Sequence, residues 1–166
     1  MHMYNIRIFR EEDSLRVLEF ISEIIVNEFN FDLELQAGGL DSDLLHIEEH
    51  YNKSGGCFWI AEENDRSKKL IGTVGIRKLT EFHDQATCEL KRMYVSKLYR
   101  RLGIGQKMLN EAIKFAIEAG YMKMVLDSSR RLTAARSLYV KNGFIDSERY
   151  NDNHRADVFM RKVLVQ

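Results

Sequence analysis

Two glycines at the start of an amphipathic helix are the feature that most constrains what this chain can be. An apolar stripe at helical spacing begins at Ile104 and stops before Gly120. Its first residues follow Arg100, Arg101 and Leu102, and residues 103 and 105 are both glycine. A helix N-terminus has unpaired N–H groups and a partial positive charge, and glycines let an anion approach the backbone closely. The arginines add charged donors. The sequence therefore predicts a pyrophosphate site where a strand, a loop and a helix meet.

Two common nucleotide-binding motifs do not fit this segment. A dinucleotide fingerprint needs a third glycine three positions after the second, and Met108 stands there. A P-loop needs Gly-Lys followed by Ser or Thr, and the segment has no such ending. The phosphate-bearing ligand is therefore of another kind.

The rest of the chain predicts a mixed α/β fold with a meander of strands in its middle. Alternating or β-rich segments predict strands at 4–9, 57–62, 70–79, 87–95, 122–127, 144–150 and 157–164. Helical spacing and end signals predict helices at 14–25, 42–51, 104–119 and 133–142. Polar turns are expected at 63–69 and 81–85, and a loop at 29–40. The absence of linkers and repeats predicts one domain over residues 1–166.

Two motifs resemble the GCN5-related N-acetyltransferase (GNAT) family. Arg100, Gly103 and Gly105 match the R/Q-x-x-G-x-G/A pattern that this family carries after a strand. Residues 138–144, Leu-Tyr-Val-Lys-Asn-Gly-Phe, are similar to its late Leu-Tyr-x-x-x-Gly-Phe signature. The resemblance covers 4–164 and is most specific over 86–145. It implies an α/β fold with a mixed, mostly antiparallel central sheet, whose fourth and fifth strands splay apart between flanking helices.

The same resemblance implies that acetyl-coenzyme A (acetyl-CoA) is the cosubstrate. Its pantetheine arm would lie in the splay and pair with the backbone of Met93, Tyr94 and Val95. An N–H at or near Val95 would polarise the thioester carbonyl. The pyrophosphate, next to Arg100, would be held by the N–H groups of Arg101, Leu102, Gly103, Ile104, Gly105 and Gln106.

Two residues match the family's catalytic positions. Tyr139 corresponds to the usual acid that protonates the departing thiolate, and Glu89 to a base that acts directly or through water. The chemistry needs both types of group, because an amine attacks only when neutral and a thiolate leaves better beside a proton donor. Structural roles stay open for both residues. Tyr139 could simply pack beside Phe144, and Glu89 could be half of a cross-strand ion pair.

The chain departs from the family after the fifth strand, where many members carry an asparagine. Ser128 or Ser129 could cap the next helix there and touch the pantetheine. His154 and Arg155 lie in a polar loop that is predicted to be solvated, with a substrate contact possible because the loop is near the family's acceptor mouth. His46 and His50 could share a helix face, but no third ligand is evident, so no metal site is predicted.

Charge and composition exclude several classes of partner. Lys plus Arg and Asp plus Glu number 25 each, which removes the electrostatic argument for nucleic acid or an anionic membrane. No run of apolar residues is long enough to cross a bilayer, and the first ten residues show no signal peptide. Cys57 and Cys88 are unclustered, which favours free thiols in a reducing compartment. A cytoplasmic location is expected.

The leading hypothesis is an N-acetyltransferase that acetylates a primary amine on a small molecule, such as an amino acid or a polyamine, by direct attack in a ternary complex. Acetylation of a protein N-terminus or lysine is an alternative in the same class. A non-catalytic acyl-CoA sensor is an alternative in another class, although a pure binder has no use for Glu89 and Tyr139. The acceptor walls are expected near 24–51 and 149–158. The acceptor and the oligomeric state, including a homodimer, stay open.

Overall fold

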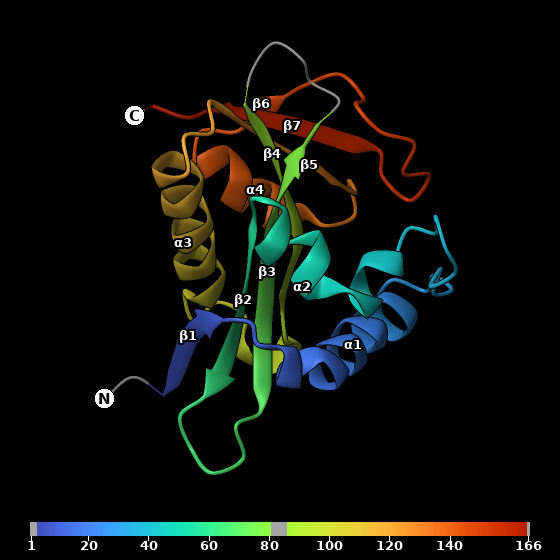
Figure 1. Cartoon of the computed structure of the whole chain (residues 1–166), viewed down its shortest axis with the longest axis vertical. Coiled ribbons are helices and arrows are strands. Elements are labelled where there is room, and N and C mark those ends of the chain that lie inside the picture. Colours follow the sequence, from blue (N-terminus) through green and yellow to red (C-terminus); the bar gives the residue numbers. More distant parts are fainter. Residues whose placement is uncertain (1–2, 81–85, 166) are drawn as a thin grey trace.

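A single mixed sheet organises the chain in the computed structural model, which describes residues 3–80 and 86–165 (Figure 1). The strand order is β1-β2-β3-β4-β5-β7-β6. The strands are β1 (Tyr4–Ile8), β2 (Cys57–Glu63), β3 (Leu70–Leu79), β4 (Thr87–Val95), β5 (Lys123–Ser128), β6 (Ile145–Asp146) and β7 (Val158–Val163). Neighbouring strands run antiparallel except β4 and β5, which are parallel. The predicted turn at 81–85 lies outside the described residues.

Helices cover both faces of the sheet. They are α1 (Ser14–Glu23), α2 (Ile47–His50), α3 (Ile104–Glu118) and α4 (Thr133–Lys141). α1 continues as a π-helical turn, Ile24–Glu28, and short 3-10 turns lie at Glu11–Asp13, Ser42–Leu45, Asn52–Ser54 and Lys97–Tyr99. Figure 1 shows α3 on one side of the sheet and α1 with α2 on the other. None of the described helices is long and apolar enough to cross a membrane.

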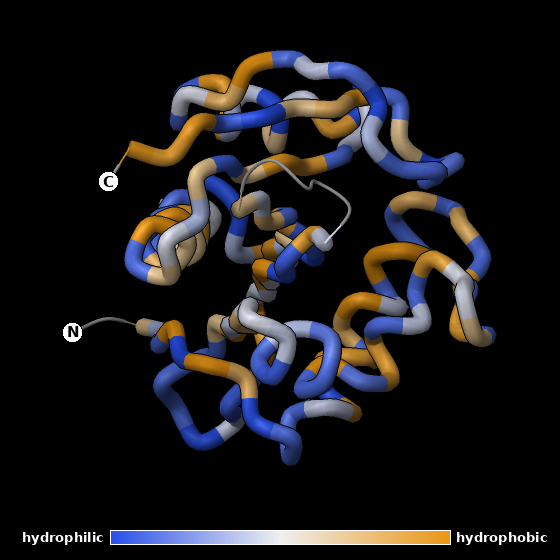
Figure 2. The backbone as a smooth tube through the Cα atoms, turned by 45° about the horizontal axis from the view of Figure 1, so that its top comes forward, coloured by the Kyte–Doolittle hydropathy of each residue, from blue (hydrophilic) through white to orange (hydrophobic). Residues whose placement is uncertain are grey.

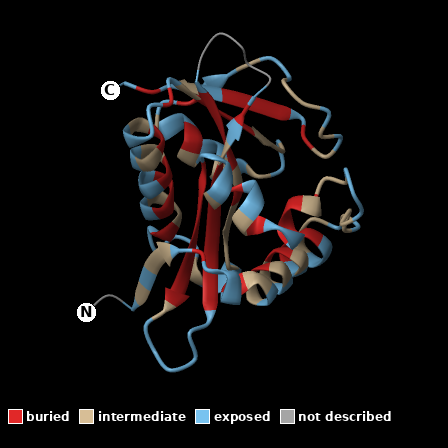
Figure 3. Cartoon of the chain, viewed as in Figure 1, coloured by how far each residue is buried: buried red, intermediate tan, exposed pale blue. Residues whose placement is uncertain are grey.

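Two apolar cores form, one on each face of the sheet. Successive side chains of a strand point to opposite faces, so Trp59 and Ala61 join the core under α3 and α4. Phe58 and Ile60 join the core under α1 and α2. Because β2 and β3 are covered on both faces, their buried residues form nearly continuous runs (Figure 3). Hydrophilic residues are concentrated in the outer turns (Figure 2).

Two predicted elements are shorter than expected. The helix expected at 42–51 is interrupted at His46, whose backbone is not helical (φ −144°, ψ 50°). The strand expected at 144–150 is only Ile145–Asp146. In that second case Tyr150 and Asn151 turn inward to contact Glu89, so the chain leaves the sheet edge. The other predicted strands and helices are present within a few residues of their expected ends.

β4 and β5 separate soon after they meet. Their pairing covers only Thr87↔Lys123, Cys88↔Met124 and Glu89↔Val125. Beyond this point β4 continues to Val95 and β5 continues to Ser128 without pairing to each other. The predicted splay is therefore confirmed, and it leaves one edge of residues 90–95 free on β4.

The two cysteines are free and buried, as expected from their spacing. Burial raises the pKa of Cys57 to about 11 and that of Cys88 to about 12. Both side chains therefore stay protonated at neutral pH and act as small core residues.

Candidate active site

The loop before α3 presents a row of free backbone N–H groups. Gly103, which precedes the helix, is left-handed with φ of 78°, and Arg101 is also left-handed with φ of 65°. Among the residues that the structure describes, no side chain caps α3. Within the described residues, the N–H groups of 101–106 have no hydrogen-bond acceptor. Successive free N–H groups at a helix N-terminus form a concave site for an anion. We call residues 101–106 the anion loop.

Gly105 connects the anion loop to the splay. A Cβ atom at this position would lie 3.6 Å from side-chain atoms of Met93 and Leu138, and 3.8 Å from Val95. Gly105 therefore sits where α3, α4 and the free end of β4 converge. A ligand with its phosphates on the anion loop would have its remaining length beside β4.

The Arg100 side chain is engaged within the protein. Its Nε donates to the carbonyl oxygen of Val95 at 2.9 Å, and Nη2 donates to Glu28 at 2.7 Å. The sequence predicted a free phosphate donor here. Instead, the guanidinium joins the end of β4 to the π-helical turn after α1, while the neighbouring Arg101 is exposed.

A β-bulge in β4 turns an extra side chain toward α1 and α2. The register between β3 and β4 shifts between Thr73 and Gly75, and Arg92 has a left-handed backbone with φ of 54°. Thr73 Oγ1 donates to the carbonyl oxygen of Arg92 at 2.7 Å. A left-handed arginine is uncommon, and its cost must be offset by the contacts that the bulge permits.

Arg92 supplies those contacts by binding the loop before α2. Its guanidinium donates to Asp43, to Asp41 at 3.0 Å and to the carbonyl oxygen of Leu40 at 2.8 Å. Tyr51 donates to Asp43 at 2.5 Å. Despite burial, the Arg92 charge holds the pKa of Asp43 well below its usual range. The loop expected at 29–40 is therefore anchored at its end to the middle of the sheet.

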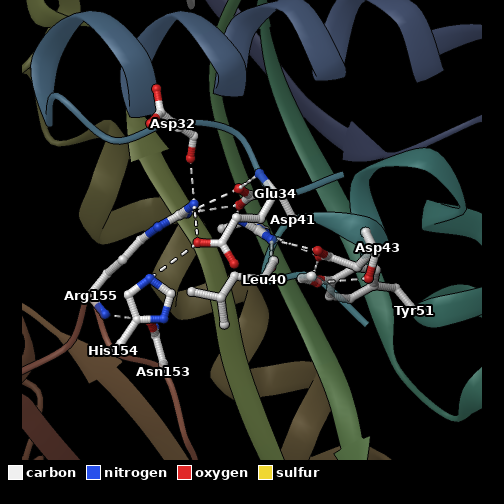
Figure 4. Close-up of polar contacts among 12 residues, drawn as sticks. Asp32, Glu34, Leu40, Asp41, Asp43, Tyr51, Asn153, His154 and Arg155 are labelled. Carbon is white, nitrogen blue, oxygen red and sulfur yellow. Dashed lines mark hydrogen bonds and ion pairs between the residues drawn. The ribbon is translucent and has the colours of Figure 1, made fainter. Parts of the chain in front are cut away.

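Arg155 ties a second loop to the same cluster (Figure 4). It donates to both carboxylate oxygens of Asp41 at 3.2 and 3.0 Å, to Glu34 at 3.0 Å and to the carbonyl oxygen of Asp32 at 2.6 Å. His154 approaches Glu34 at 3.2 Å. The expectation that Arg155 is solvated is wrong, since its side chain is only 11% exposed. A fully buried Asp41 needs more than one charged donor.

Tyr139 is buried and its ring packs on Phe144 with centroids 5.7 Å apart. Burial raises its pKa above the ordinary value, and Tyr94 and Asp127 raise it further. Those two residues belong to the separating strands β4 and β5, and the Tyr139 ring belongs to the core under α4. The phenol is protonated at neutral pH. Both predicted roles, packing and proton donation, are compatible with this position.

Glu89 lies at the last paired position before the splay and is buried. It accepts from Arg77 Nε at 2.5 Å, so the predicted cross-strand ion pair exists. It also accepts from the Tyr150 hydroxyl at 2.8 Å. Asn151 bridges Glu89 and Asp127, donating at 3.5 and 2.6 Å. Glu89 is thus part of a polar cluster at the start of the splay.

Sequence reasoning missed several polar residues around this cluster. These are Arg77, Lys91, Arg92, Asp127, Tyr150 and Asn151. Tyr150 and Asn151 fell within the expected acceptor wall at 149–158, but no feature of the sequence distinguished them from the other residues of that segment. Neither Ser128 nor Ser129 caps α4, whose N-cap is Leu132 without a side-chain bond. Within the described residues there is no group of three His, Cys, Asp or Glu side chains that could hold a metal ion.

An open anion loop that leads to the free edge of a splayed strand fits an extended ligand with phosphates at one end. Residues 19–144 match the family described as the acetyltransferase (GNAT) family. The chain belongs to this family, and its fold is that of an acetyl-CoA-dependent acetyltransferase.

Curated relatives agree with this assignment. N-acetyltransferase 8B of Homo sapiens is 32% identical over 111 residues, which span 63% of this chain and 46% of the human protein. N-acetylaspartate synthetase of Danio rerio is 34% identical over 106 residues, 63% of this chain and 36% of the fish protein. An uncharacterized N-acetyltransferase of Schizosaccharomyces pombe is 31% identical over 137 residues, 82% and 80% of the two chains. The chain thus spans about half the length, or less, of the two animal relatives.

Solved structures share the fold along the whole chain. A GNAT-family acetyltransferase of Staphylococcus aureus has a TM-score of 0.85 and 28% identity, and covers 98% of this chain and 99% of its own. A structure from Salmonella typhimurium, described with acetyl-CoA as its cofactor, has a TM-score of 0.73 and 19% identity, with coverage of 99% and 96%.

Proposed function

We propose that this chain transfers the acetyl group of acetyl-CoA to a primary amine on a small molecule, by direct attack in a ternary complex. The observation that carries the proposal is the anion loop, whose unpaired N–H groups open through Gly105 onto the free edge of β4. These residues fit a ligand with a pyrophosphate at one end and an extended arm. The arm would add to β4 as a further strand along Met93, Tyr94 and Val95.

The reaction needs two proton movements that the site residues can perform. The thioester supplies an activated acetyl carbon, and the amine nitrogen forms a bond to it while the carbon–sulfur bond breaks. One proton leaves the amine toward Glu89, directly or through water. Tyr139 gives one proton to the departing sulfur. Overall, one proton passes from the amine to the coenzyme thiol, so no redox partner is required.

The acceptor side of the site favours a small molecule over a protein. The loops at 29–41 and 151–156 lie within the expected acceptor walls at 24–51 and 149–158, and Arg155 joins these loops through Glu34 and Asp41. Walls tied together in this way suit a compact acceptor. The relative from Danio rerio is named for a small acetylated product, which is consistent with this choice. A cytoplasmic location and the oligomeric state remain predictions.

The assay that tests this function measures release of free thiol from acetyl-CoA with a panel of small primary amines and a lysine-containing peptide. Thiol release with small amines is expected. Thiol release with the peptide but with none of the small amines would favour a protein acetyltransferase. Tight binding of acetyl-CoA without release under any condition would favour the sensor.

The anion loop makes a direct prediction for coenzyme binding. Gly105→Asp is expected to weaken acetyl-CoA binding at least about tenfold, because a carboxylate would face the phosphates at a helix N-terminus. Gly105→Ala is the steric control, since its Cβ would meet only ordinary contacts of 3.6 Å or more. Calorimetric titration gives both dissociation constants. Unchanged affinity in the aspartate variant would mean that the pyrophosphate lies elsewhere.

Glu89 can be tested against its structural role. Glu89→Gln is expected to lower kcat by about 10–100-fold, because the amide cannot take the amine proton, although water can partly replace it. Arg77→Met is the matched control, since it also breaks the cross-strand ion pair but keeps the carboxylate. If Glu89→Gln and Arg77→Met lose the same amount of stability and both keep the parent's turnover, Glu89 serves only as an ion-pair partner and does not act as a base.

A further inference from the structure

Each of the two separating strands carries one charged side chain that forms no ion pair among the described residues. Lys91 lies two residues beyond Glu89 on β4, and Asp127 lies two residues beyond Val125 on β5. Since Glu89 and Val125 are the last pair, Lys91 and Asp127 occupy equivalent positions on the separating strands. Side chains alternate along a strand, so both point to the same face of the sheet as Glu89, toward α1 and α2.

Lys91 is partly exposed and has no charged partner. Within the described residues its Nζ makes no hydrogen bond and no ion pair. Its cross-strand neighbour is Gly75, and a Cβ there would lie 2.6 Å from the Tyr51 ring. The tyrosine ring therefore occupies the space beside Lys91 on the β3 side. On the other side, β4 is no longer paired with β5 at Lys91.

The carboxylates nearest to Lys91 are already occupied. Asp43 is bound by Arg92 and Tyr51, and Glu89 is bound by Arg77 and Tyr150. Burial lowers the pKa of Lys91, while the Glu89 and Asp43 charges oppose this effect and Arg92 and Arg77 reinforce it. A half-buried ammonium with arginines nearby is an attractive site for an anion from outside the protein.

Asp127 is the matching anion on the other separating strand. One of its oxygens accepts from the neutral Asn151 amide at 2.6 Å, and within the described part of the chain it forms no ion pair. Its charge raises the pKa of Tyr139 and of Tyr150. The same Asn151 amide also donates to Glu89 at 3.5 Å, so an ammonium beside Asp127 would lie close to the proposed base.

We propose that the acceptor amine also carries a carboxylate, as an amino acid does, with Lys91 binding that carboxylate and Asp127 binding the ammonium before it loses its proton. This inference rests on the proposed function and narrows its substrate class. The same arrangement selects against a polyamine, because a second ammonium would meet Lys91 and be repelled.

The experiment compares amino acids with the amines that remain after removal of the carboxylate. Suitable pairs are leucine with 3-methylbutylamine and phenylalanine with 2-phenylethylamine, with spermidine as a third kind of acceptor. Thiol release at saturating acetyl-CoA gives kcat/KM for each. In the parent, the carboxylate-bearing member of each pair is expected to be preferred at least about tenfold, mainly through KM, as for a charge-assisted hydrogen bond.

Variants of Lys91 test whether this residue causes the preference for acceptors that carry a carboxylate. In the Lys91→Met variant, the ratio of kcat/KM between the amino acid and its matching amine is expected to fall close to one. The Lys91→Arg variant is expected to keep most of the parent's preference for the amino acid. Lys114→Met, an exposed lysine on α3 away from the splay, is the control and should leave the ratio unchanged. Thermal unfolding of each variant checks that it folds, and the parent's own preference provides a test that needs no variant.

The possible outcomes separate this inference from the proposed function. Turnover of simple amines or spermidine without preference for a carboxylate overturns the inference but keeps acetyl transfer to amines. A Lys91→Met variant that slows both members of a pair equally makes Lys91 a structural residue and overturns its assignment. Absence of thiol release with every amine, while acetyl-CoA binds, overturns the amine transferase and this inference together.

Discussion

Replacing Tyr139 by phenylalanine is expected to lower kcat by about 10²–10⁴, the usual contribution of a positioned general acid. The ring would still pack on Phe144, whose centroid lies 5.7 Å away, so the fold should change little. Burial already holds the phenol protonated at neutral pH, and the thiolate that leaves the thioester gains from that proton. The effect should therefore appear in the chemical step.

The measurement is turnover at saturating acetyl-CoA, with the dissociation constant of acetyl-CoA determined alongside. Phe144→Leu is a matched control, because it disturbs the same packing and leaves the hydroxyl in place. A Tyr139→Phe enzyme with turnover within about threefold of the parent would exclude the acid role, since this lies far below the range for general acids. The fold and the anion loop would be unaffected by that result.

The second large effect is expected on stability. Asp41 and Asp43 are buried, with exposed fractions of 0% and 4%. Arg92→Met would remove the guanidinium that binds both carboxylates. Removing one partner of a buried ion pair typically destabilises a protein by about 3–5 kcal/mol. We expect a loss of that size in the free energy of unfolding, measured with urea. The loop before α2 should become sensitive to proteolysis.

An exposed pair provides the comparison for Arg92. Arg136 binds Asp146 at 2.9 Å, but the two side chains are 46% and 67% exposed. Arg136→Met should therefore cost less than about 1 kcal/mol. Equal losses in the two variants would mean that the Arg92 cluster contributes no more than a surface ion pair, and that the left-handed backbone at Arg92 has another cause.

The elements that could be predicted are those whose signals are local. Apolar and β-rich runs placed the strands of the meander close to their observed limits, because strands that are covered on both faces are buried over nearly their whole length. The glycine pair marked the start of α3, because only nearby residues decide whether a helix N-terminus is capped. The family resemblance added the splay, which local patterns alone do not indicate.

The polar cluster around the acceptor side could not be predicted, because its partners are distant in the sequence. Arg92 and Asp41 are 51 residues apart, and Arg155 and Asp41 are 114 apart. In the sequence, nothing distinguishes these charged residues from ordinary surface residues, and only the fold buries them. Burial then makes pairing obligatory, and the paired charges hold the loops at 29–41 and 151–156 together.

The sequence by itself therefore determined the fold class, the anion loop and the positions of Tyr139 and Glu89, because each depends on residues adjacent along the chain or on a motif. Only the tertiary structure decided the surroundings of those residues. In the folded chain, Arg100 and Glu89 bind internal partners and Arg155 joins an ion-pair network. Lys91 and Asp127 lie at equivalent positions on the two separating strands, and neither forms an ion pair among the described residues. The reason is physical: electrostatic pairing depends on distance in space and on burial, and neither can be read from neighbours in the sequence.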